Sequence, residues 1–424
     1  MNLKINTSAI IERSMNKIDE RLMEHGKRVG YMIYWTLKAH GWSGARLRDM
    51  ALLGILHDVG AYKTEELDNM VQFETTDVWA HSIYGYLFMK HFSPMKKLAP
   101  VLLYHHARAG QVGALDAESA MLAQLTFLCD RADLFYLTGG DFDGFVKYLA
   151  GVRDRLFSGE AIDMLVKAGV THEVWAQVNE DADFAQLLRD EPMSEADTIG
   201  FLKMVVFSID FRSPQTLLHT HALTLVARKL AELVGVPEQE IRRIEVGALV
   251  HDIGKMGTPL HILESTGKLS DADFAIMRQH VSVSEEILTG CIDDDIVAMA
   301  ANHHEKMDGT GYPNQLKGAA LPVANRIISV ADVLSALWGN RSYKPALPKE
   351  KVLEILADMR GGHLDEWLVD LAVAYYDEIA AVMTEHAKEI EDTYAAVGRE
   401  QAEIGALLKT GEYDLSAYFQ DCYA

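Results

Sequence analysis

The densest group of potential metal ligands lies between positions 302 and 313, in the sequence Asn-His-His-Glu-Lys-Met-Asp-Gly-Thr-Gly-Tyr-Pro. Adjacent imidazoles on a helix point in different directions, so an ordinary packed core rarely uses both of them. Two neighbouring metal ions can use both. The glycines at 309 and 311, followed by Tyr312-Pro313, predict that a helix ends here and that a rigid loop follows.

A second cluster of metal-ligand residue types begins at His251-Asp252, which follow an apolar helical pattern. A neutral imidazole beside a carboxylate suits Fe, Mn, Co, Ni or Zn, and an aspartate can bridge two ions. Two metals about 3.5–4 Å apart can activate water and clamp phosphate oxygens. We therefore predict a two-metal centre in which Asp252 bridges and polarises. Its predicted ligands are His219, His251, Asp252, His280, His303, His304 and Asp332.

Three cations lie close in sequence to these ligands. Lys255 follows Asp252 by three residues, and Arg341 and Lys344 follow the predicted ligand Asp332. Positive charges aimed at a phosphate neutralise the charge that develops in its transition state. We predict that these three side chains bind the substrate phosphate and that Lys255 takes part in catalysis.

Composition excludes several other classes of function. The formal charge is −22 and the sequence pI is about 5.2, which argues against polymeric nucleic acid and an anionic membrane surface as partners. The three cysteines show no CxxC spacing, and the first residues lack the apolar core of a signal peptide. No apolar run approaches the roughly 18 residues that span a membrane. We therefore expect a cytoplasmic protein.

The elements that position these residues are predicted to be helices throughout, because apolar residues recur with a period of 3.6 and strand-like alternation is scarce. The expected fold class is all-α, with two copies of a multi-helix domain. The ligand types of the second half recur in the same order in the first half. His25 precedes His57 by 32 residues (57 − 25), and His219 precedes His251 by the same 32 (251 − 219). The residues of this candidate second cage are His25, His57, Asp58, His81, His105, His106 and Asp130.

These repeats and the polar stretch near residue 190 predict four segments. A degenerate N-terminal domain is expected over 1–190, a linker over 191–205 and a catalytic domain over 206–390. A helical tail rich in aromatic residues is expected over 391–424, docked on the body of the protein or on a partner subunit. A homodimer is one candidate assembly.

The segment from His303 to Pro313 resembles the signature HHExxDGxGYP of the HD-GYP family, a subgroup of the HD superfamily of metal-dependent phosphohydrolases. The resemblance covers about 180 residues of the second half. It implies a helical domain with an iron or manganese centre that hydrolyses a cyclic dinucleotide. It also implies that Asp308, Gly311, Tyr312 and Pro313 shape the site, Asp308 as a catalytic residue and the loop as a substrate contact.

The sequence departs from the family pattern at some positions. Gln215 stands where members with three metals have a glutamate, which favours two metals here, and Ser335 stands where an aspartate is usual. In the first half, Ala61 occupies the position that corresponds to Lys255, and no Gly-Tyr-Pro loop follows His105-His106. A metal ion is still a candidate ligand there, but the more economical interpretation is a regulatory or structural domain.

The leading prediction is a phosphodiesterase that opens a cyclic dinucleotide to the linear 5′-phosphorylated dinucleotide. Cyclic di-GMP and 3′3′-cyclic GMP-AMP are equally compatible substrates, because the metals recognise only phosphate. One alternative is another HD-type phosphohydrolase, acting on a nucleotide monophosphate or (p)ppGpp. The other is a non-catalytic signalling protein that binds a partner through the Gly-Tyr-Pro loop.

Overall fold

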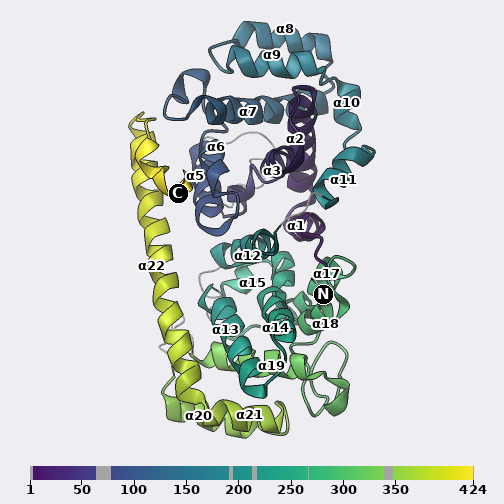
Figure 1. Ribbon diagram of the computed structural model, residues 1–424, viewed down its shortest axis with the longest axis vertical. Helices are drawn as coiled ribbons and strands as arrows, with labels where there is room; N and C mark the ends of the chain where they lie inside the picture. Colours follow the sequence, from purple (N-terminus) through teal and green to yellow (C-terminus); the bar gives the residue numbers. More distant parts are fainter. Residues whose placement is uncertain are drawn as a thin grey trace. The chain divides into compact units, whose positions relative to one another are not determined.

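The computed structural model describes residues 3–63, 78–190, 194–212, 217–265, 267–338 and 347–423. Within these ranges every named element is an α-helix or a 3-10 helix, and extended pairing is limited to isolated bridges (Figure 1). The predicted all-α fold class is confirmed.

The chain divides into two compact units. The first-copy unit consists of Asp19–Phe201 together with Ala395–Ala424, and the second-copy unit consists of Met1–Ile18 together with Leu202–Tyr394. Helix α22 (Tyr376–Lys409) therefore contributes its beginning to one unit and its end to the other. The four segments expected from the sequence stay predictions.

The first-copy unit is built around helix α2, which packs against α3 and α7, while α5 packs against α6 and the 3-10 turn η1. Asp19 caps α2 by accepting a hydrogen bond from the backbone N–H of Arg21, and the buried residues of α2 recur at helical spacing. The elements are α2 (Glu20–Ala39), α3 (Gly44–Ile55), η1 (Val59–Lys63), α5 (Val78–Phe92), α6 (Ala99–Leu103) and α7 (Ala117–Leu137).

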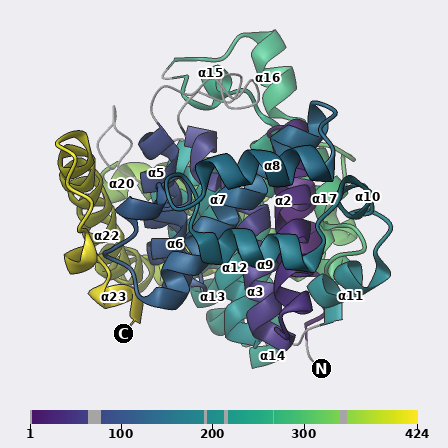
Figure 2. The same ribbon diagram turned by 90° about the horizontal axis from the view of Figure 1, so that it is seen from above.

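The second-copy unit repeats this arrangement around helix α13, which packs against α14 and α19. Leu223 and Leu230 of α13 and Ile327 and Leu334 of α19 are fully buried in one core. The elements are α13 (Leu217–Val234), α14 (Glu238–Val250), η4 (Ile253–Gly257), α17 (His280–Leu288), α18 (Asp294–Ala301) and α19 (Val323–Trp338). Two short helices of this unit, α15 (Leu260–Leu263) and α16 (Asp271–Met277), also lie against one another (Figure 2).

Each copy continues into a pair of helices, and the two pairs share a detail that confirms the duplication of the fold. In the first copy, α8 (Phe142–Val152) and α9 (Gly159–Ala168) lie side by side near α7 (Figure 1). An Arg153–Asp163 ion pair of 2.7 Å joins them. In the second copy, an Arg360–Asp370 ion pair of 2.7 Å joins α20 (Lys349–Met359) to α21 (Glu366–Ala374).

A close approach of backbone to backbone places the His-Asp pair in each copy. A Cβ atom on Gly60 would lie 2.0 Å from the carbonyl oxygen of His81, and one on Gly254 would lie 2.0 Å from that of His280. No side chain fits at either distance, so glycine is required two residues after each His-Asp aspartate. The close approach holds the 3-10 turn against the helix that carries the next histidine.

The C-terminal tail is part of the first-copy unit. The Tyr104 hydroxyl donates a hydrogen bond to the carbonyl oxygen of Tyr413 at 2.5 Å, and the Tyr86 hydroxyl donates to that of Tyr418 at 2.8 Å. Phe419 is buried beside both donor tyrosines. The aromatic residues of the tail therefore dock on this unit.

The N-terminal helix α1 (Thr7–Asn16) belongs to the second-copy unit. The Arg13 guanidinium donates a hydrogen bond to the carbonyl oxygen of Thr289 at 2.7 Å, and the backbone N–H of Asn6 donates one to the carbonyl oxygen of Cys291 at 2.7 Å.

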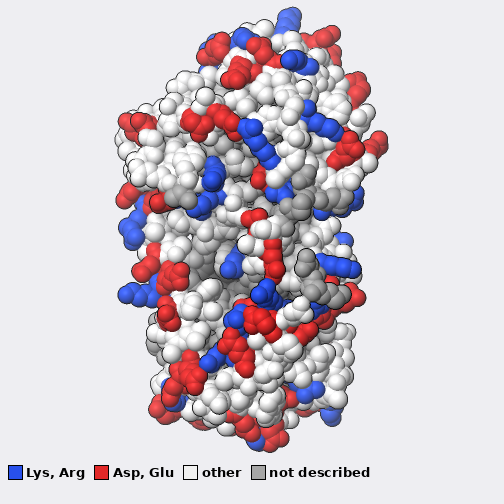
Figure 3. Space-filling model, in the orientation of Figure 1, with Lys and Arg blue, Asp and Glu red and all other residues white. Residues whose placement is uncertain are grey.

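Acidic side chains are spread over the face shown in Figure 3, with Lys and Arg between them, in keeping with the net charge of −22. No helix in the described ranges is long and apolar enough to cross a membrane.

Candidate metal centre

The second copy brings all seven predicted ligands together from five places in the fold. His219 lies in the first turn of α13, and His251-Asp252 directly follow α14. His280 is the first residue of α17, while His303-His304 follow α18. Asp332 comes from the middle of α19. Helix ends and first turns supply most of the ligands, because side chains there can leave the helix surface and meet.

Three of the histidines are oriented in the same way by their own backbone. The Nδ1 atoms of His251, His280 and His303 lie 2.7, 2.6 and 2.7 Å from the carbonyl oxygens of Ala248, Met277 and Ala300, each three residues earlier. A carbonyl can only accept, so Nδ1 carries the proton and Nε2 presents a lone pair. This is the tautomer that binds a metal ion through Nε2.

The carboxylate of Asp252 lies between two groups of ligand atoms. Its Oδ2 is 3.0 Å from His251 Nε2, and its Oδ1 is 3.2 Å from His280 Nε2 and 3.8 Å from His303 Nε2. Oδ1 is buried and has no hydrogen-bond partner among the described residues. Such an atom fits the bridging position of a two-metal site, because a second ion would satisfy it.

Asp332 also lies between the two groups of ligand atoms. Its Oδ1 lies 3.1 Å from His219 Nε2, and its Oδ2 lies 3.8 Å from His304 Nδ1. Ligand atoms within 4.8 Å of one another form two sets, one of His219, His251 and Asp252 and the other of His280, His303 and His304. The residues present therefore fit two adjacent metal ions.

Burial favours the neutral form that ligation needs in three of the histidines, His280, His303 and His304. It lowers the pKa of His280 to about 4 and that of His303 well below its ordinary value. Burial alone would raise the pKa of Asp252, but His251 and Lys255 outweigh it and hold that pKa well below its usual range. His280 and His303 are therefore neutral and Asp252 ionised at neutral pH.

One of the three predicted phosphate-binding cations can be placed. The Lys255 ammonium contacts Asp252 Oδ2 directly, so its charge lies at the centre of the site. Arg341, Lys344 and Gln215 lie outside the described residues, and their roles stay predictions. Ser335, which replaces the usual aspartate, places its hydroxyl 3.1 Å from His219 Nδ1.

The Gly-Tyr-Pro loop folds back over the double histidine. The Tyr312 ring centroid lies 4.9 Å from that of His304, and the Arg278 guanidinium lies 4.3 Å from the Tyr312 ring. A Cβ atom on Gly311 would lie 2.5 Å from the Cα of Glu305, so only glycine allows this approach. The Tyr312-Pro313 peptide is cis.

Asp308 makes the contacts of a residue that stabilises this loop. Its carboxylate accepts hydrogen bonds from the Thr310 backbone N–H and hydroxyl at 2.8 and 2.7 Å, and it lies 3.9 Å from His363 Nε2. No described contact joins it to the ligands. Its catalytic role stays a prediction.

Sequence reasoning missed two buried residues that support the site. Glu305 accepts hydrogen bonds from the backbone N–H groups of Asn314 and Leu316 at 2.6 and 3.0 Å, which anchors the loop. Ser284 joins the His251 carbonyl to the Gly254 backbone N–H. Glu305 is the glutamate of the HHExxDGxGYP signature, but no role was assigned to it, and Ser284 has no signal of its own.

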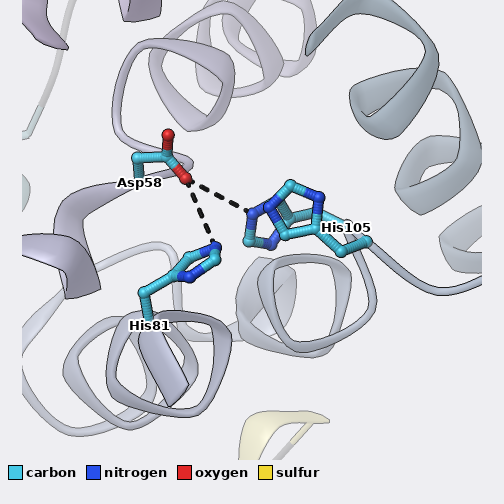
Figure 4. Close-up of side chains that lie close together, drawn as sticks. Asp58, His81 and His105 are labelled. Carbon is cyan, nitrogen blue, oxygen red and sulfur yellow. Dashed lines mark ion pairs between the residues drawn. The ribbon is translucent and has the colours of Figure 1, made fainter. Parts of the chain in front are cut away.

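The first copy brings its own seven residues together in a similar arrangement, and Figure 4 shows three of them, Asp58, His81 and His105. Asp58 Oδ2 lies 3.4 Å from His57 Nε2, and Asp58 Oδ1 lies 3.6 and 3.5 Å from the Nε2 atoms of His81 and His105. Asp130 lies 3.4 Å from His25 and 3.7 Å from His106, as Asp332 does with His219 and His304. The candidate second cage is therefore brought together by the fold.

Comparison with known proteins bears on both copies. Residues 204–368 match the HD domain family model. The chain is 28% identical over 390 residues to the 3′3′-cGAMP-specific phosphodiesterase 1 of Vibrio cholerae, covering 86% of this chain and 89% of that protein. It is 38% identical over 178 residues to phosphodiesterase 2 of the same specificity and organism, covering 41% of this chain and 34% of that protein.

A third relative, the cyclic di-GMP phosphodiesterase response regulator RpfG of Xanthomonas campestris, is 36% identical over 172 residues, covering 40% of this chain and 46% of its own length. The chain thus spans less than half of the last two relatives. A crystal structure of a cyclic GMP-AMP specific phosphodiesterase of V. cholerae shares the fold, with a TM-score of 0.52, 16% identity and coverage of 90% and 98% of the two chains. Residues 204–368, which contain all seven ligand positions of the second copy, are thus similar to the HD domain family.

Proposed function

We propose that the second copy is a metal-dependent phosphodiesterase that hydrolyses a cyclic dinucleotide. The observation that carries this proposal is the position of Asp252, whose two oxygens face two separate sets of imidazoles. The names of the relatives, all cyclic dinucleotide phosphodiesterases, support the same substrate class.

The proposed cofactor is a pair of divalent ions, iron or manganese first, with nickel, cobalt or zinc as alternatives. When bound, such a pair supplies positive charge for the phosphate oxygens and lowers the pKa of water. The seven ligand residues would hold the two ions on either side of Asp252.

The reaction adds the oxygen of one water to phosphorus and breaks one P–O3′ bond. The water proton passes to the departing 3′ oxygen, which leaves a linear dinucleotide with a 5′-phosphate. Lys255 lies against Asp252, so its ammonium is available to an entering phosphate. Its charge would stabilise the pentacoordinate transition state more than the substrate.

The proposed substrate is 3′3′-cyclic GMP-AMP, with cyclic di-GMP as the alternative. The relative that matches across both copies is named for 3′3′-cGAMP. Relatives that match the second copy alone are named for either substrate.

We also propose a cytoplasmic location, with which the three free, buried cysteines agree. Partner binding through the loop at 309–313 stays a prediction.

The test uses the full-length chain, stripped of metal and reloaded with Mn²⁺ or, without oxygen, Fe²⁺. Cyclic GMP-AMP, cyclic di-GMP and cyclic di-AMP are supplied separately, and the products are identified by mass. We expect metal-dependent formation of a linear 5′-phosphorylated dinucleotide, fastest with cyclic GMP-AMP. D252N should abolish it, while D294N, which removes an exposed aspartate at the start of α18, should not. Turnover in D252N equal to that of D294N would refute the proposal.

A further inference from the structure

In the candidate cage of the first copy, seven buried side-chain atoms find no hydrogen-bond partner within the part of the chain that the structure describes. These atoms are His57 Nε2, Asp58 Oδ1, both ring nitrogens of His81, His105 Nε2, His106 Nδ1 and Asp130 Oδ2. An unsatisfied buried polar group costs about 1–3 kcal/mol. Such a cluster would be strongly destabilising unless one bound group satisfied most of its atoms together.

The spacing of these atoms identifies the kind of group. Two ligands held about 2.1 Å from one ion lie roughly 3.0–3.4 Å apart at octahedral or tetrahedral angles. Asp58 lies 3.4 Å from His57, 3.5 Å from His105 and 3.6 Å from His81, which is close to this separation and too long for good hydrogen bonds. We propose that the first copy is itself a divalent-metal site, centred on Asp58, whose role is structural.

The residues around this cage differ from those around the ligands of the second copy. The position three residues before Asp130 is Phe127, whose ring packs edge-on against His106 at 5.5 Å. The equivalent position before Asp332 is Ser329, a small residue, and the ring near His304 there is Tyr312 of the loop. The side chain of His106 is 8% exposed, against 30% for His304.

The first copy lacks the lysine that contacts the aspartate of the His-Asp pair in the second copy, and its nearby cation is Arg131, whose Nε lies 3.6 Å from Asp130 Oδ2. Ala61 occupies the place of Lys255, and it is fully buried. An aromatic ring packs against the ligand His106, and no lysine at this position could receive a phosphate. These features suit a closed site that stabilises the fold rather than one that keeps a position open for substrate.

A second difference between the copies concerns the residue that contacts Nδ1 of the first ligand histidine, His25 or His219. In the first copy, Asp133 Oδ2 lies 2.7 Å from His25 Nδ1, and its other oxygen accepts from Arg28 Nε at 2.5 Å and Trp175 Nε1 at 2.6 Å. In the second copy, the corresponding position holds only the hydroxyl of Ser335. A carboxylate behind a ligand histidine orients its ring and makes it a stronger donor.

Asp133 is therefore a positioning residue, and it makes the first copy the tighter of the two metal sites. Loss of such a carboxylate typically weakens metal binding about 10- to 100-fold. Ser335 occupies the position that corresponds to Asp133. The carboxylate can therefore be removed from the first copy and introduced into the second, and its effect on metal binding can be compared. Neither claim depends on catalysis by the second copy.

The experiment measures Mn²⁺ per chain by elemental analysis after the full-length protein has been loaded and dialysed. We expect D252N to retain manganese, D58N to retain less than the wild type, and the double variant to retain none. Metal should also raise the thermal midpoint of D252N. A folded D252N chain that holds no manganese, or a D58N chain that holds as much as the wild type, would overturn the proposal. If circular dichroism shows that D58N does not fold, the manganese content of D252N alone decides whether the first copy binds metal.

The role of Asp133 is tested by metal release to a chelator. D133N, which keeps the shape of the side chain, should release first-copy manganese about 10-fold faster or more, measured in the D252N background. S335D should slow release from the second copy, measured in the D58N background. An unchanged release rate in the D133N chain would remove Asp133 from the proposal while leaving the metal content to decide the site.

Discussion

The hydroxyl of Ser284 donates a hydrogen bond to the carbonyl oxygen of His251 at 3.0 Å and accepts one from the backbone N–H of Gly254 at 2.9 Å. One buried side chain on α17 thus holds both sides of Asp252 in place. The metal-bridging carboxylate depends on this link, although serine is neither a ligand nor a cation.

S284A should leave two buried backbone groups without partners. We expect the free energy of unfolding to fall by about 1–3 kcal/mol and kcat to fall with it, because Asp252 loses its support. Chemical denaturation and steady-state kinetics measure both. T289A serves as the control, since Thr289 lies at the exposed end of the same helix. Equal effects of the two substitutions would contradict this role.

K255M should remove the charge beside Asp252 while keeping much of the side-chain volume. We expect kcat to fall by about 10²- to 10³-fold, as for other groups that stabilise a transition-state charge. Metal content should stay unchanged, because Lys255 is not a ligand. K229M, which removes a lysine paired with Glu378 on the surface of the same unit, is the matched control. A loss of metal in K255M would show that the lysine acts through the cage instead.

G311A should displace the Gly-Tyr-Pro loop. The added methyl group would lie 2.5 Å from Glu305 Cα and from the Lys306 backbone nitrogen, so the backbone must move. We expect Tyr312 to leave His304 and activity to fall at least tenfold, with about 1–3 kcal/mol of destabilisation. G267A is the control, because nothing lies within 4 Å of a Cβ there. Full activity in G311A would mean that the loop does not shape the site.

The pH dependence of the first-copy unit should report on Glu400. Burial would raise the pKa of this carboxyl, but hydrogen bonds from His91, Lys90 and Tyr86 outweigh it and lower the pKa below its ordinary value of 4.5. A depressed pKa in the folded state stabilises the protein above the unfolded-state pKa. That contribution is lost as the pH falls through the folded-state value, below 4.5.

The measurement compares wild type with E400Q by denaturation between pH 7 and pH 3. We expect the wild type to be more stable at pH 7 and the difference to shrink below pH 4.5, the ordinary value for this carboxyl. E389Q, an exposed substitution on the same helix, should show no such convergence. A difference that persists unchanged to pH 3 would contradict the assignment of Glu400 as the titrating group.

The ligands could be predicted from the sequence because histidine and aspartate pairs are rare and recur in one order in both copies. The residues that position them could not. Ser284 and Phe127 are ordinary residue types whose roles appear only when distant helices meet. Asp133 is detectable from the sequence, since it lies three residues after Asp130, at the position that corresponds to Ser335. The docking of α1 and of the tail depends on contacts between residues more than 270 positions apart, which no local pattern records.

The path of the chain through its two units has a consequence for any attempt to separate them. The boundary is crossed at Ile18, at Phe201 and again within α22 at Tyr394. A single scission between the repeats would strip each half of a segment that packs into its core, such as Ile10 from one and Phe419 from the other. Each unit is therefore discontinuous in the sequence, and a gene fragment that encoded one repeat alone would omit part of its fold.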